Sequence, residues 1–77
     1  MPAITAEQTR ALLKETAPGT HWEDLATDDS LADAGLDSLD KVTFIMKVEE
    51  ATGLSIPDEA YDDMDTIESV IAYVEAA

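Results

Sequence analysis

The sequence predicts an all-α protein, a small four-helix bundle with a long loop between helices 1 and 2 and a short third helix. Two observations support this fold class. Apolar residues recur three and four positions apart, which is the spacing of one helix face, and residues typical of helix starts and stops bound these segments. The chain has 77 residues, of which 45% are apolar, so we expect one folded domain over residues 1–77 with a modest core.

The first helix is expected over about residues 6–17. Thr5 and Gln8 have the spacing of a capping box, in which each side chain accepts a hydrogen bond from the backbone amide of the other residue. Pro18 and Gly19 follow the last apolar position. They predict the end of the helix there, because both residues disfavour its continuation.

A long connection is expected over residues 18–37, where Thr, Asp, Ser and Gly are frequent. Loops of this length are uncommon in a compact domain and are usually functional or disordered. Single apolar residues along the segment are spaced as anchors, which suggests that it packs across the bundle and has room for a short helical turn. These anchors are Trp22, Leu25, Leu31 and Leu36.

The second helix is expected over residues 38–52. Asp37 is a good N-cap residue, and Asp40 adds a second carboxylate to the first turn, where the helix dipole favours negative charge. Gly53 follows the last helical residue and fits the left-handed conformation that often ends a helix. This segment therefore has clear signals at both ends.

Two further helices complete the predicted bundle. A short third helix is expected over about residues 58–63, and a fourth over residues 66–75. Thr66 and Ser69 form a weaker start signal for the fourth helix. Apolar residues then recur at positions i, i+3, i+4 and i+7, which indicates one buried face. They are Ile67, Val70, Ile71 and Val74.

The second helix carries two apolar stripes, whereas a surface helix normally carries one. The first stripe contains Phe44, Val48 and Ala51, with Ile45 beside them. The opposite stripe contains Leu39, Val42 and Met46, and its charged surroundings include Asp40, Lys47, Glu49 and Glu50. One explanation is a helix that is buried all round. An apolar patch with a polar rim is instead typical of a docking surface, and we expect a partner to bind Leu39, Asp40, Val42, Met46, Glu49 and Glu50.

The charge balance restricts the classes of partner. The chain has 18 acidic and 4 basic residues, a formal net charge of −14. Nucleic-acid binding is excluded because neutralising phosphates requires Lys and Arg, and binding to an anionic membrane is equally disfavoured. Such a charge favours partners with basic patches, although acidity for solubility alone is the simpler alternative.

The sequence contains no cysteine, which excludes disulfides and cysteine-ligated metals. Residues 58–65 are rich in carboxylates but lack the ligand order and the glycine of an EF-hand, so we expect no metal site. The single histidine, His21, does not make a catalytic triad. The N-terminal stretch is polar and no apolar run approaches the roughly 20 residues of a membrane span, so we expect a cytoplasmic protein.

The residues before and within the second helix resemble a known attachment motif. At its centre is Asp37-Ser38-Leu39-Asp40, and three more features follow in matching order: Val48-Glu49-Glu50, Ile56-Pro57-Asp58-Glu59, and Ile67-Glu68-Ser69-Val70 ahead of Tyr73. This series is similar to that of the acyl carrier protein family and spans nearly the whole chain. The tetrapeptide alone would be a weak signal, but the ordered set is specific.

The resemblance implies a non-catalytic, monomeric carrier. Ser38, flanked by Asp37, would hold 4′-phosphopantetheine through a phosphodiester, which a separate phosphopantetheinyl transferase adds from coenzyme A with Mg²⁺. Acyl cargo would be bound as a thioester on the sulfur of this arm and would be loaded and processed by enzymes with basic docking patches. The residues agree, because a chain without cysteine needs a borrowed thiol and a hydroxyl at a helix start is accessible.

Several departures and alternatives stay open. Many members of the family keep the partner face of this helix acidic, whereas Lys41 and Lys47 are basic here and Thr43 replaces a common acidic residue. Fatty-acid synthesis is therefore no more expected than polyketide or other specialised acyl biosynthesis. The alternatives are an aminoacyl or peptidyl carrier, and an acidic interaction adaptor without a prosthetic group, in which Ser38 is only a helix cap residue.

Overall fold

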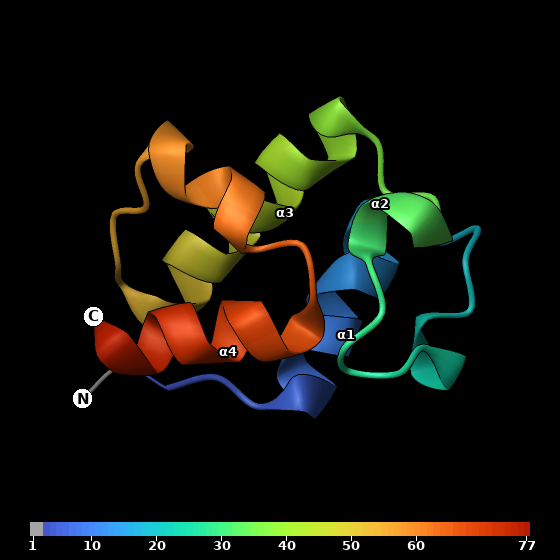
Figure 1. The fold of residues 1–77 in the computed structure, drawn as a ribbon, viewed down its shortest axis with the longest axis horizontal. Coiled ribbons are helices and arrows are strands. Elements are labelled where there is room, and N and C mark those ends of the chain that lie inside the picture. The colour runs from blue at the N-terminus through green and yellow to red at the C-terminus, as the bar shows by residue number, and fades with distance from the viewer. Residues whose placement is uncertain (1–2) are drawn as a thin grey trace.

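The computed structural model describes residues 3–77 and is helical in all its regular elements (Figure 1). The elements in chain order are α1 (Ala6–Thr16), the 3₁₀ turn η1 (Trp22–Asp24), α2 (Leu31–Ala34), α3 (Ser38–Thr52), the 3₁₀ helix η2 (Asp58–Asp63) and α4 (Ile67–Ala76). α1 packs against α3, α4 and η1. The predicted all-α bundle is confirmed.

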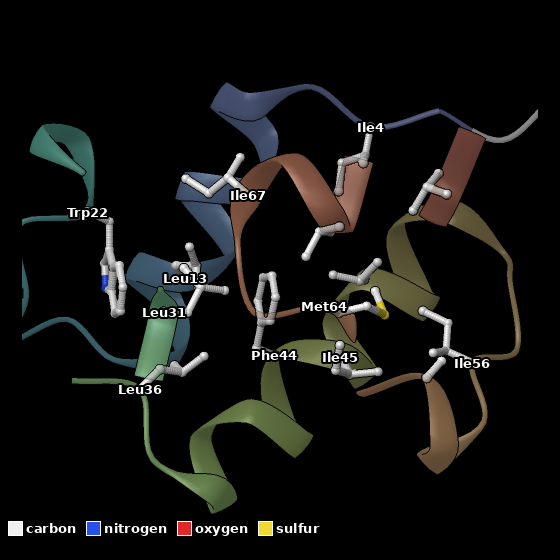
Figure 2. Packing of buried hydrophobic residues seen from close by; sticks show 14 residues of the cluster. Ile4, Leu13, Trp22, Leu31, Leu36, Phe44, Ile45, Ile56, Met64 and Ile67 are labelled. Carbon is white, nitrogen blue, oxygen red and sulfur yellow. The ribbon is translucent and has the colours of Figure 1, made fainter. Parts of the chain in front are cut away.

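The core is a single apolar cluster to which every helix contributes (Figure 2). Phe44 of α3 points into the middle of this cluster, and its side chain is fully buried. The buried apolar residues are Ile4, Leu13, Trp22, Leu31, Leu36, Phe44, Ile45, Val48, Ile56, Ala60, Met64, Ile67, Val70 and Val74. Aliphatic residues and Met supply most of this core, since the chain has few aromatic residues.

The predicted helix bounds agree closely with the structure. α1 begins with the predicted capping box of Thr5 and Gln8 and ends at Thr16, one residue earlier than expected. α3 has the predicted bounds and cap residues. The third helix has the expected bounds but is 3₁₀ in type, and α4 lies one residue later than expected because Thr66 is its N-cap.

The long connection of residues 18–37 is held in place by its apolar anchors. Trp22, Leu31 and Leu36 are buried, and Leu25 is half-buried. The indole Nε1 of Trp22 donates a hydrogen bond of 2.7 Å to the carbonyl oxygen of Ala17. Two short helical turns, η1 and α2, form within the segment, which therefore packs on the bundle as expected.

The two faces of α3 lie slightly away from where the sequence places them. Phe44, Ile45 and Val48 are buried as expected, but Ala51 is exposed, so its predicted place in the core is wrong. At about 100° per residue, the buried face is centred between Phe44 and Ile45. In the last turn this face carries the half-buried Thr52, while Ala51 lies at its edge.

Gly53 ends α3 in the left-handed conformation, with φ of 77°. We predict that Gly53→Ala lowers the free energy of unfolding by about 1 kcal/mol, because an L-residue is strained at this φ. Steric contact does not contribute, since a Cβ at position 53 would have no heavy atom within 4 Å. Urea unfolding followed by circular dichroism measures the change.

Gly19→Ala is the matched control. A Cβ there also has open space, and Gly19 does not have a positive φ. This variant should keep the stability of the parent or gain slightly. Equal losses in the two variants would contradict the assignment of the cost to the backbone conformation of Gly53.

Candidate functional site

Ser38 is exposed at the first position of α3. Asp37 is the N-cap, as predicted, and its Oδ1 accepts a hydrogen bond of 2.8 Å from the backbone amide of Asp40. Within residues 3–77, no hydrogen bond engages the hydroxyl of Ser38. Asp37 therefore caps the helix, and the neighbouring hydroxyl of Ser38 takes no part in the cap.

The backbone before Ser38 makes a sharp turn from α2 into α3. Gly35 ends α2 with φ of 121°, a conformation that favours glycine. The backbone amide of Leu36 then bonds to the carbonyl oxygen of Leu31 at 3.0 Å, and both of these side chains are buried. Ser38 thus lies two residues beyond a buried anchor, which limits how far its position can vary.

The start of α3 suits an attached phosphodiester. The backbone amides of Ser38 and Leu39 have no acceptor among the residues that the structure describes, and these free donors carry the positive end of the helix dipole. A phosphate on the Ser38 oxygen would meet this field, although the carboxylates of Asp37 and Asp40 lie beside it. An arm attached there would have access to solvent, because the side chain of Ser38 is exposed.

The second apolar stripe of α3 faces solvent. Leu39, Val42 and Met46 are 80%, 42% and 54% exposed, and they are the large apolar residues most exposed to solvent in the described structure. The stripe begins next to Ser38 and continues for two turns along the helix. The interpretation of α3 as buried all round is therefore wrong.

The lysines of α3 do not share this stripe. Lys41 lies on the buried side, with its Nζ 3.9 Å from Oδ1 of Asp65 and its side chain 17% exposed. Lys47 turns toward α1, with its Nζ 3.9 Å from Oε1 of Glu15. The expectation that both lysines make the partner face less acidic stays a prediction, because each keeps its positive charge while its ammonium group is directed at a carboxylate of another segment. Thr43 stays exposed.

Glu49 has a structural contact that the sequence did not predict. Its Oε2 accepts a hydrogen bond of 2.7 Å from the backbone amide of Ile56, which ties the linker after α3 back to the helix. Partial burial and the nearby carboxylates of Asp58 and Glu49 raise the pKa of Tyr61 in η2. The side chain of Glu50 is exposed, whereas that of Glu49 is half-buried.

The other side chains considered for catalysis or metal binding belong to segments other than the start of α3. His21 is exposed, and its Nδ1 lies 3.5 Å from Oε1 of Glu23. A hydrogen bond with its own backbone, together with the contact to His21, holds the pKa of Glu23 below its usual value. In the described part of the chain, no group of three His, Asp or Glu side chains has the arrangement of a metal site.

Two surface grooves of about 570 and 240 Å³ are present. The larger is lined by Glu7, Arg10, Ala11, Lys14 and Glu23, and the smaller by Leu25, Asp29, Ser30, Asp33 and Ala34. Neither groove includes Ser38. No helix of residues 3–77 is both long and apolar enough to cross a membrane.

A small helical bundle with a free serine hydroxyl at a helix start, beside an exposed apolar stripe, has the features of a carrier module. Residues 11–74 match the family model described as the phosphopantetheine attachment site. The chain is also 32% identical, over 74 residues, to the acyl carrier protein of Helicobacter hepaticus (strain ATCC 51449 / 3B1), covering 96% of this chain and 87% of that protein.

The chain therefore belongs to the acyl carrier protein family of phosphopantetheine-attachment proteins. Members of this family are non-catalytic carriers whose prosthetic group is 4′-phosphopantetheine, attached by a separate transferase. The resemblance of the motifs to this family is thereby confirmed, as is the expected cofactor.

We predict that Glu49→Ala lowers the free energy of unfolding by about 1–3 kcal/mol, because it leaves the amide of Ile56 without its acceptor. Glu50→Ala is the matched control, since it removes the same charge from the same helix at an exposed position. Urea unfolding of both variants measures the difference. Equal free energies of unfolding in the two variants would contradict this prediction, because they would mean that water replaces the carboxylate of Glu49 without loss of stability.

Proposed function

We propose that this protein carries acyl intermediates as thioesters on a 4′-phosphopantetheine arm attached to Ser38. The observation that supports this most is the position of Ser38, which is exposed at the first residue of α3. Its hydroxyl has no hydrogen-bond partner within residues 3–77. Membership of the phosphopantetheine-attachment family gives that hydroxyl its chemistry.

The residues around Ser38 have separate tasks in this function. Asp37 caps α3, so that the Ser38 oxygen remains available for the phosphodiester. The free amides at the start of α3 offset the negative charge of the phosphate. When attached, the arm supplies the thiol that holds the cargo, which the chain itself lacks because it has no cysteine.

The exposed stripe next to Ser38 is proposed as the surface on which the transferase and the acyl-processing enzymes dock. Leu39, Val42 and Met46 form its apolar centre, and Met46 adapts to partners of different shape. Asp40 and Glu50 supply acidic groups at the rim, which attract basic patches. Glu49 keeps its negative charge, but its hydrogen bond with the amide of Ile56 holds the carboxylate toward the linker after α3.

The cargo is proposed to be acyl, in fatty-acid, polyketide or other specialised acyl biosynthesis. The relative from Helicobacter hepaticus is an acyl carrier protein by name. The lysines of α3 leave fatty-acid synthesis among the candidate pathways, because their ammonium groups are directed at Asp65 and Glu15 of other segments. Incubating the modified protein with acyl-loading and aminoacyl-loading enzymes tests this choice, and loading by aminoacyl adenylates alone would overturn it.

We predict that a broad-specificity phosphopantetheinyl transferase, with coenzyme A and Mg²⁺, adds one phosphopantetheine to the protein and none to Ser38→Ala. Intact-mass spectrometry measures the gain. Ser55→Ala is the control, because Ser55 is also exposed and should not be modified. Absence of any gain with active transferases, on a folded and unmodified protein, would favour an adaptor without a prosthetic group.

Two methionines offer a matched test of the docking surface. Met46 is 54% exposed and Met64 is fully buried. We predict that Met46→Ala raises the transferase KM about fivefold, equivalent to roughly 1 kcal/mol of lost docking, and leaves the melting temperature unchanged.

The Met64→Ala variant should instead lower the free energy of unfolding by about 2–5 kcal/mol, because it opens a cavity in the core. Steady-state kinetics and thermal melts distinguish these effects. A Met46→Ala variant that melts early yet docks normally would show that the stripe stabilises the fold and does not bind partners.

A further inference from the structure

Asp65 lies in the turn between η2 and α4, one residue before the N-cap of α4, and contacts the segment that leads to Ser38. One carboxylate oxygen, Oδ2, accepts a hydrogen bond from the hydroxyl of Ser30. The other, Oδ1, accepts from the backbone amide of Ala32 at 3.1 Å. The carbonyl oxygen of Asp65 accepts from the amide of Leu31 at 2.7 Å. All three donors belong to the start of α2.

The same carboxylate also reaches the first turn of α3. Lys41 follows Ser38 by three residues, and its Nζ lies 3.9 Å from Oδ1 of Asp65. The side chains of Lys41 and Asp65 are 17% and 33% exposed, so water and salt screen this ion pair less than one on an open surface. Asp65 therefore contacts the chain on both sides of Ser38, through α2 before it and α3 after it.

The segment between these contacts carries the reactive hydroxyl, which has no hydrogen bond of its own within the described residues. Leu36 anchors that segment in the core, and Gly35 has the backbone conformation of a tight turn. A hydrogen-bonded carboxylate at one end and an ion pair at the other restrict how α2 and α3 rotate about this turn. The orientation of the Ser38 hydroxyl depends on that rotation.

We propose that Asp65 is a positioning residue for the reaction at Ser38. It holds α2 and the first turn of α3 in one arrangement, so that a bound transferase meets the Ser38 oxygen at the correct distance and angle. This inference rests on the proposed attachment of phosphopantetheine to Ser38. Asp65 lies outside the exposed stripe of Leu39, Val42 and Met46, so it acts on the reaction step and not on docking.

The test measures kcat and KM for phosphopantetheine transfer from coenzyme A, with the carrier as the varied substrate. In this step the Ser38 oxygen loses its proton and bonds to the β-phosphorus of coenzyme A, the pyrophosphate bond breaks, and adenosine 3′,5′-bisphosphate leaves. Asp65→Ala should lower kcat about tenfold while KM stays within about twofold, because a small displacement of a reacting group slows the chemical step. Asp63→Asn is the control, since Asp63 is exposed in η2 and loses the same charge close by. It should keep the kcat of the parent.

Two further variants separate the hydrogen bonds from the ion pair. Asp65→Asn removes the charge but keeps polar atoms near Ser30 and Ala32, so its kcat should lie between those of the parent and Asp65→Ala. Lys41→Met should lower kcat in the parent and have no further effect in the Asp65→Asn protein. Such non-additivity is the expected signature of two groups that act through one contact.

All rates are measured at a temperature where circular dichroism shows every variant folded. If Asp65→Ala fails to fold, Asp65→Asn and Ser30→Ala provide the comparison, and ¹⁵N relaxation of the Ser38 amide should show increased motion relative to the core amide of Phe44. An unchanged kcat in the folded variants overturns the inference alone. No transfer to the parent protein overturns the proposed attachment and this inference together.

Discussion

Burial of one face of α3 is the constraint on which the rest of the structure depends. Phe44, Ile45 and Val48 are fully buried, and together they orient the helix relative to α1. Because a helix turns by about 100° per residue, fixing this face also directs the opposite stripe into solvent. Ser38, the first residue of α3, is exposed next to that stripe. One packing interaction thus defines both the core and the candidate site.

The long connection of residues 18–37 is also held against the bundle, so the chain before Ser38 has a defined position. Trp22, Leu31 and Leu36 each bury a side chain, and the intervening backbone bonds to the turn before α4 through Asp65. A segment with so few apolar residues has little hydrophobic stabilisation of its own, so these polar contacts matter more than they would inside a regular helix. Ser38, the proposed attachment residue, is therefore exposed on a segment that is itself well held.

The charges of the chain have two distinct uses. With 18 acidic and 4 basic residues, most carboxylates have no cationic partner and create the negative field that suits basic enzymes. The lysines of α3 are instead directed at Glu15 and Asp65, where they link α3 to other segments. Lys41 and Lys47 thus contact other segments, and Asp40 and Glu50 lie beside the exposed stripe.

The sequence by itself determined the main helices to within one residue, the caps Thr5, Asp37 and Gly53 and the exposed stripe of α3, because these signals lie within a few neighbouring residues. It also determined the carrier family, through an ordered set of motifs along nearly the whole chain. Only the tertiary structure decided the contacts between distant segments. Glu49 bonds to Ile56 seven residues away, and Ser30 bonds to Asp65 across 35 positions. No local pattern encodes such pairs, because packing of the helices creates them. The direction of Lys41 and the exposure of Ala51 depend on that same packing.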